Sequence, residues 1–91
     1  MRSEEVIGKA VLGSDAQIIG KVSEIEFDKI TWIISDICVD LEKNVMETMG
    51  FKKPRLGGIK TNIPVTEISA ISDVVSLKKN ATELKSTAKR V

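Results

Sequence analysis

Five acidic side chains have the spacing best suited to chemistry in this sequence. Glu24, Glu26 and Asp28 alternate along one segment, and Asp36 and Asp40 follow on the next. Alternate residues of an extended strand point to the same side, so the first three project together and the other two lie across from them. Oxygen-rich clusters of this kind hold divalent cations, but no calcium loop shaped by glycine accompanies them. A solvated outer sheet face is the commoner role, and we expect no metal ligands here.

A basic segment is the second candidate for chemistry. The stretch "KKPRLGGIK" contains four cations and no acidic residue, and its candidate anion contacts are Lys52, Lys53, Arg55 and Lys60. Lysine and arginine bind phosphate, helped here by the backbone of Gly57 and Gly58; a solubilising loop is the alternative. No aromatic residue lies between these cations, so a platform for stacking bases is not expected. Contact with nucleic acid would be electrostatic and nonspecific.

Most catalytic chemistry is missing from the sequence. Histidine and tyrosine are absent, which excludes a Ser-His-Asp triad and a Cys-His pair. No glycine-rich loop of the phosphate-binding kind is present. The single cysteine, Cys38, lies in the apolar run "WIISDICVDL" and indicates a reduced, buried thiol. We therefore expect a protein that is not an enzyme and has no catalytic residues and no cofactor.

The size and composition indicate one small domain. The chain has 91 residues, of which 42% are hydrophobic and 30% are charged, and its net charge is +1. The near-neutral charge gives no overall attraction to nucleic acid or anionic membranes. No apolar segment has the length of a signal-peptide core or a membrane span. These features lead us to expect a cytoplasmic protein.

The first half predicts strands that bend sharply. Residues 5–13 read as a strand closed by Gly13, and residues 14–17 as a turn. In the next strand, residues 18–27, the apolar phase slips between Val22 and Ile25, which predicts a β-bulge near residues 23–24. Gly20 adds a second point of bending. Strands with a glycine and a bulge close small barrels.

The middle of the chain predicts another long strand and a helix. A tight connection at residues 28–29 leads into a strand over residues 30–41, which carries apolar residues on both faces. Residues 41–51 suit a short helix with Asp40 as its N-cap and Gly50 just after its end. The second apolar face of the strand needs a cover, either a helix of the same chain or a second copy of the protein.

The last third predicts short strands and a C-terminal segment. Residues 59–63 alternate as a strand, and two further strands meet at a hinge over residues 72–73. Asn80 and Glu83 have the spacing of a capping box, so residues 80–91 form either a docked helix or a frayed tail. The expected fold is mainly all-β, a barrel of about six strands with one short inserted helix and a C-terminal helix. Residues 1–79 would form the barrel domain, and its fold should survive removal of the basic segment 80–91.

Apolar residues exceed what one small barrel needs inside. The candidate partner or dimer interface consists of Trp32, Ile34, Met46, Met49 and Phe51. Methionine and aromatic side chains suit contact surfaces. The alternative is that the helix covers the sheet face within one chain.

Three segments carry a resemblance to a known family. The stretch "VIGKAVLGSDAQIIGKVSEIEFD" (residues 6–28) resembles the opening of PRC-barrel domains, and "TWIISDICV" resembles their third strand. "NIPVTEISAISDVVSLK" (residues 62–78) is similar to their closing segment. The helix and basic loop at residues 41–58, and the basic tail, depart from the pattern. The family includes the cytoplasmic domain of the photosynthetic reaction-centre H subunit and the C-terminal domain of the ribosome maturation factor RimM.

The resemblance implies a docking module rather than an enzyme. Small stand-alone members are common in archaea, and some are linked to the cell-division machinery as adaptors. It thus implies a protein–protein adaptor that binds other proteins and forms a homodimer. The alternative is a factor in RNA metabolism or ribosome assembly, related in role to RimM. Residues 78–91 carry five basic side chains and one acidic one, and convergence of this tail with the basic loop would favour that alternative.

Overall fold

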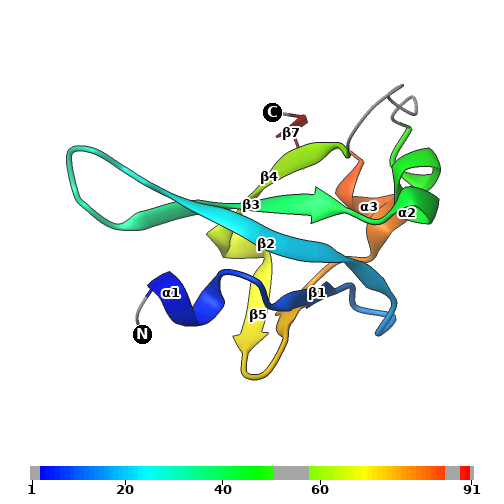
Figure 1. Ribbon diagram of the computed structural model, residues 1–91, viewed down its shortest axis with the longest axis horizontal. Helices are drawn as coiled ribbons and strands as arrows, with labels where there is room; N and C mark the ends of the chain where they lie inside the picture. The colour runs from blue at the N-terminus through cyan, green and yellow to red at the C-terminus, as the bar shows by residue number, and fades with distance from the viewer. Residues whose placement is uncertain (1–2, 51–57, 86–88, 91) are drawn as a thin grey trace.

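A computed structural model describes residues 3–50, 58–85 and 89–90, and shows a mainly β protein (Figure 1). The strands are β1 (Ala10–Leu12), β2 (Ile18–Phe27), β3 (Ile34–Leu41), β4 (Lys60–Pro64), β5 (Ile68–Ile71), β6 (Val75–Leu77) and β7 (Lys89–Arg90). The helices are α1 (Ser3–Val6), α2 (Lys43–Thr48) and α3 (Ala81–Leu84), with a 3-10 turn, η1 (Val65–Glu67). The prediction of a mainly β fold with short helices is confirmed.

The strands form one mixed, strongly bent sheet. Its order is β5-β6-β1-β2-β3-β4-β7, and only the β1–β6 pair is parallel. The described strands give an open sheet with β5 and β7 as its edges. The long β2–β3 hairpin runs along the molecule, and its closed end projects beyond the other elements (Figure 1).

The β2 strand bends where the sequence predicts. Val22 pairs with Val39 and Glu24 pairs with Cys38, so Ser23 is an extra, unpaired residue between them. This bulge confirms the phase slip and turns Glu24 to the outer face of the sheet while Ile25 packs against the core. Gly20 is needed because a β-carbon there would overlap the carbonyl oxygen of Asp40.

Serine is the extra residue in two further bulges. Glu26 pairs with Asp36 and Phe27 with Ile34, which leaves Ser35 unpaired. Ser69 is left over in the same way between β5 and β6. Each of the three serine hydroxyls donates to a carbonyl oxygen of the facing strand, namely those of Cys38, Glu26 and Ser76. The hydroxyls thus bond carbonyls at points where the ladder is interrupted.

The core lies on the inner side of the sheet and continues between α2 and α3. Its fully buried apolar side chains come from β1 to β4, β6, α3 and the residue before β4: Val11, Ile19, Val22, Ile37, Val39, Ile59, Ile63, Val75 and Leu84. Cys38 is also buried and is a free thiol, as predicted. A small domain needs such a shared core because its burial of apolar surface is its main source of stability.

The first and third predicted strands begin later than expected. Residues 3–6 form the helix α1, so the first strand starts at Ala10 rather than at residue 5. The third begins at Ile34 rather than at residue 30, because residues 28–33 form the turn of the hairpin. Backbone bonds to the Asp28 side chain compete there with a regular ladder.

The predicted helix over residues 41–51 is shorter. Asp40 belongs to β3, and Glu42 precedes α2 without a side-chain cap bond, so the predicted N-cap is wrong. The predicted end is confirmed: Gly50 has a φ of 79°, a left-handed conformation that glycine adopts without strain. The apolar stripe of the helix, including Val45, points into the core.

The first turn of the C-terminal segment is ordered and docked. Asn80 accepts a bond from the Glu83 amide at 2.9 Å, and the Glu83 carboxylate accepts one from the Asn80 amide at 3.0 Å. This is the predicted capping box. Ala81 and Leu84 join the same core as the strands, so residues 80–84 are structurally part of the domain.

Candidate functional site

Four large apolar side chains are exposed together at the end of the β2–β3 hairpin. Ile30 is 91% exposed, Trp32 77%, Ile33 67% and Phe27 45%. We call these four residues the apolar tip. Single exposed apolar residues are ordinary, but four of them at the end of one projecting hairpin are typical of an interaction site.

The Asp28 side chain fixes the backbone of the turn that carries the apolar tip. Its Oδ1 accepts hydrogen bonds from the amides of Ile30, at 2.8 Å, and Thr31, at 3.1 Å. The Trp32 amide donates to the Asp28 carbonyl oxygen at 2.7 Å, and the Asp28 amide donates to the Ile33 carbonyl oxygen at 2.9 Å. The bonds from Ile30 first, and then from Thr31, lower the pKa of the Asp28 carboxyl from its ordinary value of 3.8. The apolar tip is therefore held in a defined conformation.

The backbone of Trp32 is unfavourable for its residue type. Its φ is 60°, in the left-handed region that glycine and asparagine adopt more easily. The indole is also largely in water, where it contributes little to folding. Trp32 thus adds strain and exposed apolar surface to the turn, and its side chain suits recognition better than stability.

The hairpin separates apolar from acidic side chains. Ile25 and Phe27 face the core side of β2, whereas Glu24 and Glu26 face the outer side. Asp36 lies directly opposite Glu26 on β3. We call Glu24, Glu26 and Asp36 the acidic face. Among the described residues, no lysine or arginine forms an ion pair with these three carboxylates.

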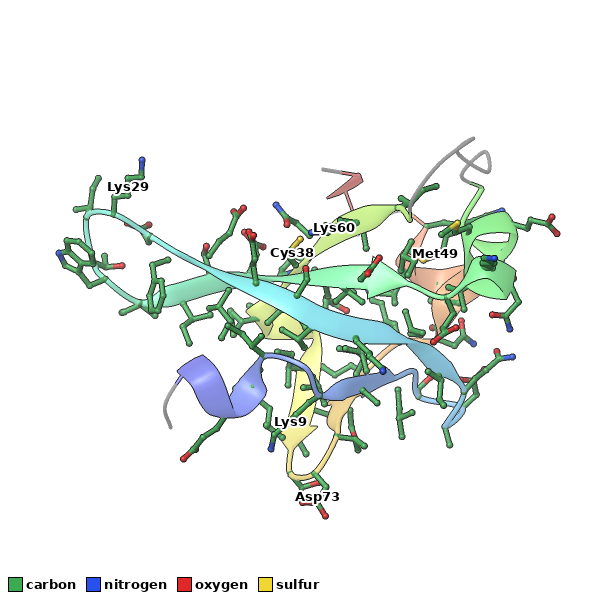
Figure 2. All side chains as sticks on the ribbon, viewed as in Figure 1. Lys9, Lys29, Cys38, Met49, Lys60 and Asp73 are labelled. Carbon is green, nitrogen blue, oxygen red and sulfur yellow. The ribbon has the colours of Figure 1, made fainter. Side chains whose placement is uncertain are left out.

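The structure separates the residues predicted to form one interface. Trp32 is exposed in the turn and Ile34 is half-buried next to it at the start of β3. Met46 and Met49 are buried in the core, so they do not extend that surface; α2 covers its end of the sheet from within the chain. Figure 2 shows Met49 at the opposite end of the molecule from the turn residue Lys29. Phe51 lies outside the described residues.

Three members of the apolar tip were missed by the sequence analysis. Ile30 and Ile33 were read as strand residues because "ITWII" is rich in β-branched and aromatic side chains, and Phe27 was read as the last residue of the preceding strand. The signal that could have found them is Asp28, since an aspartate at the start of such a segment favours a turn closed by its own side chain.

Of the predicted anion contacts, the described residues include only Lys60. Lys52, Lys53 and Arg55 lie outside them. Lys60 is exposed and lies next to Asp40, which faces Lys21 on its other side. Opposite charges therefore alternate across β2, β3 and β4 at this end of the sheet. The backbone of Lys89–Arg90 in β7 pairs with β4 directly after Lys60.

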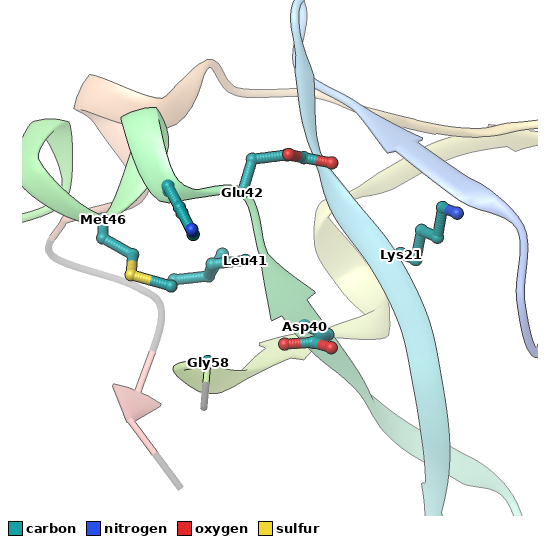
Figure 3. Close-up of a pocket in the computed structure, with 7 residues that line it drawn as sticks. Lys21, Asp40, Leu41, Glu42, Met46 and Gly58 are labelled. Atoms are coloured by element: carbon teal, nitrogen blue, oxygen red, sulfur yellow. The ribbon is translucent and has the colours of Figure 1, made fainter. Parts of the chain in front are cut away.

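A shallow pocket of about 360 Å³ lies between β3 and α2. Its lining consists of Lys21, Asp40, Leu41, Glu42, Lys43, Met46 and Gly58. Figure 3 shows Asp40 beside Gly58 on one side of the pocket and Lys21 on the far side of β2. Two lysines and two carboxylates balance in charge, and the described residues of the lining include no cysteine, serine or histidine that would act as a nucleophile or base. The pocket gives no indication of a reaction.

In the part of the chain that the structure describes, no group of three or more His, Cys, Asp or Glu residues has an arrangement that could hold a metal ion. None of the helices among the described residues has the length and apolar character needed to cross a membrane. In comparisons with known proteins, no family model and no curated protein matches the chain.

Proposed function

We propose that the chain is a non-catalytic protein–protein interaction module, an adaptor that docks through its apolar tip. The observation that carries this proposal is the combination of exposure and rigidity: four apolar side chains project into water from a turn fixed by Asp28. A preordered turn loses little conformational entropy on binding. Tryptophan is the residue type most enriched at interface hot spots.

The wider proposal follows the resemblance to PRC-barrel domains. It makes the chain a cytoplasmic archaeal adaptor with a role in cell division. Support comes from the motifs at residues 6–28 and 62–78, and from the bend in β2 at Gly20 and Ser23. Homodimerisation through Trp32 and Ile34 is one form of the proposal, and binding to a different protein is the other.

The test is affinity capture from a lysate of the host, with ribonuclease, using the tagged full chain as wild type and as two variants. Trp32→Asn removes the indole and suits the left-handed backbone, so its fold should persist. Ile18→Ala removes another half-exposed apolar side chain, outside the turn, as the matched control. We expect the wild type and the control to capture the same proteins and Trp32→Asn to lose them. Equal capture by all three would contradict the proposal.

A role in RNA metabolism or ribosome assembly is the second candidate. It is favoured by one observation: β7 pairs with β4, which places the backbone of the basic tail beside the strand that follows the basic loop. Fluorescence anisotropy with a labelled single-stranded RNA tests it. If it holds, Lys60→Glu weakens binding and Lys29→Glu, at the end of the projecting hairpin and away from Lys60, does not (Figure 2). Absence of RNA binding by the wild type would exclude it.

A further inference from the structure

We propose that the partner of the apolar tip is a basic amphipathic segment of another protein. Its apolar side chains would pack on the tip, and its lysines or arginines would lie over the acidic face. This inference rests on the proposed function and adds the chemistry of the partner. It also assigns a purpose to carboxylates that no lysine or arginine pairs with in the part of the chain that the structure describes.

The charges near the apolar tip are uncompensated within the described chain. Glu26 and Asp36 are direct cross-strand neighbours, an arrangement that destabilises a sheet because like charges repel. The next residue across the sheet from Asp36 is Pro64, which brings no positive charge. The one cation of the turn is Lys29, and it is exposed.

At the pocket end of the same strands, acidic and basic side chains are neighbours instead. There Asp40 lies between Lys21 and Lys60, so each charge has an opposite neighbour. Among the described side chains, opposite charges are therefore neighbours at the pocket end of the sheet but not at the tip end. A cationic partner would supply the missing balance, and it would also be steered toward the tip by the field of the carboxylates.

The same charges disfavour two alternative partners of the apolar tip, which are a second copy of the chain and an anionic membrane. In a two-fold dimer formed tip to tip, each copy would bring its own Glu26 and Asp36 toward those of its partner, and like charges across an interface repel. An anionic membrane surface would repel them as well. A basic segment satisfies both the apolar and the acidic side of the hairpin.

Because the backbone of the turn is hydrogen-bonded, a partner that binds its small apolar surface causes little loss of conformational entropy. The Asp28 carboxylate holds the amides of Ile30 and Thr31, so the apolar side chains on either side of Trp32 start from a fixed backbone. A partner segment that crosses the end of the hairpin would meet the apolar tip first. The acidic face begins directly behind it, at Glu26 on one strand and Asp36 on the other.

The experiment uses the full chain and two labelled helical peptides with the same leucine stripe. One peptide has lysines beside the stripe and the other has glutamates at the same positions. Binding is read by the anisotropy of the label and by the emission of Trp32, the only tryptophan. We expect the lysine peptide to bind about tenfold more tightly or better, to shift the Trp32 emission to the blue, and to weaken as salt is added.

A charge-reversed variant tests the contact with the acidic face separately from the contact with the apolar tip. Glu26→Lys places an opposite charge beside Asp36, so the fold should be as stable as the wild type. This variant should lose the preference for the lysine peptide. The control is Asp73→Lys, an exposed carboxylate in the turn between β5 and β6, away from the hairpin end (Figure 2), and it should keep the preference.

Four other outcomes would overturn the inference, and the first three identify an alternative. Equal binding of the two peptides, with loss of both in Trp32→Asn, removes the charge argument but leaves the tip as a docking element. A Trp32 emission that shifts with the concentration of the chain alone indicates a second copy. A shift only with phosphatidylcholine or phosphatidylglycerol vesicles indicates a membrane and also contradicts the proposed function. Failure of the lysine peptide to bind at all rejects the inference.

Discussion

The hydroxyl of Ser23 donates a hydrogen bond to the carbonyl oxygen of Cys38, 3.2 Å away on the neighbouring strand. Ser23 is the extra residue of the bulge that turns Glu24 outward and Ile25 inward. The bond therefore joins β2 and β3 where their backbone pairing is interrupted. The division of the hairpin into an acidic and an apolar side begins at this point.

Removal of that hydroxyl should weaken the domain. In Ser23→Ala the part-buried Cys38 carbonyl loses its donor, and we expect the free energy of unfolding to fall by about 1 kcal/mol. Urea denaturation of the variant measures this change. Ser14→Ala, at an exposed turn position, is the control and should unfold like the wild type. Identical midpoints for all three proteins would show that the bulge does not depend on the bond.

Gly20→Ala should be more damaging. The new methyl group would overlap the Asp40 carbonyl oxygen and lie 2.9 Å from Cγ1 of Val39. Relief of the clash requires β2 and β3 to separate, and we expect a loss of about 1–3 kcal/mol in thermal or urea unfolding. Lys21→Ala, at the next and exposed position, should change stability by less than about 0.5 kcal/mol. A tolerant Gly20→Ala variant would contradict the close approach of the two strands.

Leu84→Ala should destabilise the fold by about 2–5 kcal/mol, because Leu84 is 0% exposed within the common core. A chain ending at residue 79 loses this side chain, Ala81 and the capping box together. We therefore expect the truncated protein to lose cooperative melting, which reverses the expectation from sequence that the barrel would survive. Lys85→Ala, at an exposed neighbour, is the control. A truncated protein that melts like the full chain would contradict the docking of α3.

The turn should depend on the ionisation of Asp28. Its folded-state pKa is lowered, so its contribution to stability is present above the ordinary value of 3.8 and is lost as the pH falls through the lower, folded-state value. An NMR titration of the Asp28 carboxyl should show a midpoint below 3.8. Amide exchange of Ile30 and Thr31 should accelerate over the same range. In Asp28→Asn, which keeps an acceptor oxygen but has no charge, this dependence should disappear. A midpoint at or above the ordinary value would contradict the hydrogen-bonded turn.

Trp32→Asn should separate stability from binding. Asparagine tolerates the left-handed backbone, and the exposed indole makes little contribution to the core, so stability should stay equal or rise by about 1 kcal/mol. Thermal melting measures this effect. A marked loss of stability would show that the indole supports the fold and would weaken its assignment to recognition.

The sequence predicted those features whose cause is local. The bulge at Ser23 follows from a slip in apolar phase, the capping box from the spacing of Asn80 and Glu83, and the end of α2 from Gly50. The turn was predicted at residues 28–29 only, because the propensity of "ITWII" favours a strand; it extends to Ile33, since side-chain bonds to the backbone override that propensity.

The sequence predicted only part of the candidate site, because the burial of its other proposed residues depends on contacts between distant segments. Trp32 was identified as an interface residue, and its exposure agrees with a position on the surface. Met46 and Met49 were grouped with it because a methionine stripe is the same in sequence whether it faces a core or a partner. Only the packing of α2 against α3 and the strands places them inside. The burial of Leu84 also depends on these distant contacts.

Acrylamide quenching of Trp32 fluorescence is the most direct test of the central claim that the apolar tip docks onto another protein. The chain is measured alone and then with a protein that it captures from its host. Because Trp32 is the only tryptophan of the chain and is 77% exposed, we predict strong quenching of the free chain. With a captured protein whose own tryptophans are replaced by phenylalanine, quenching should fall severalfold. An unchanged quenching constant in a complex that is fully formed would contradict the assignment of the tip as the docking surface.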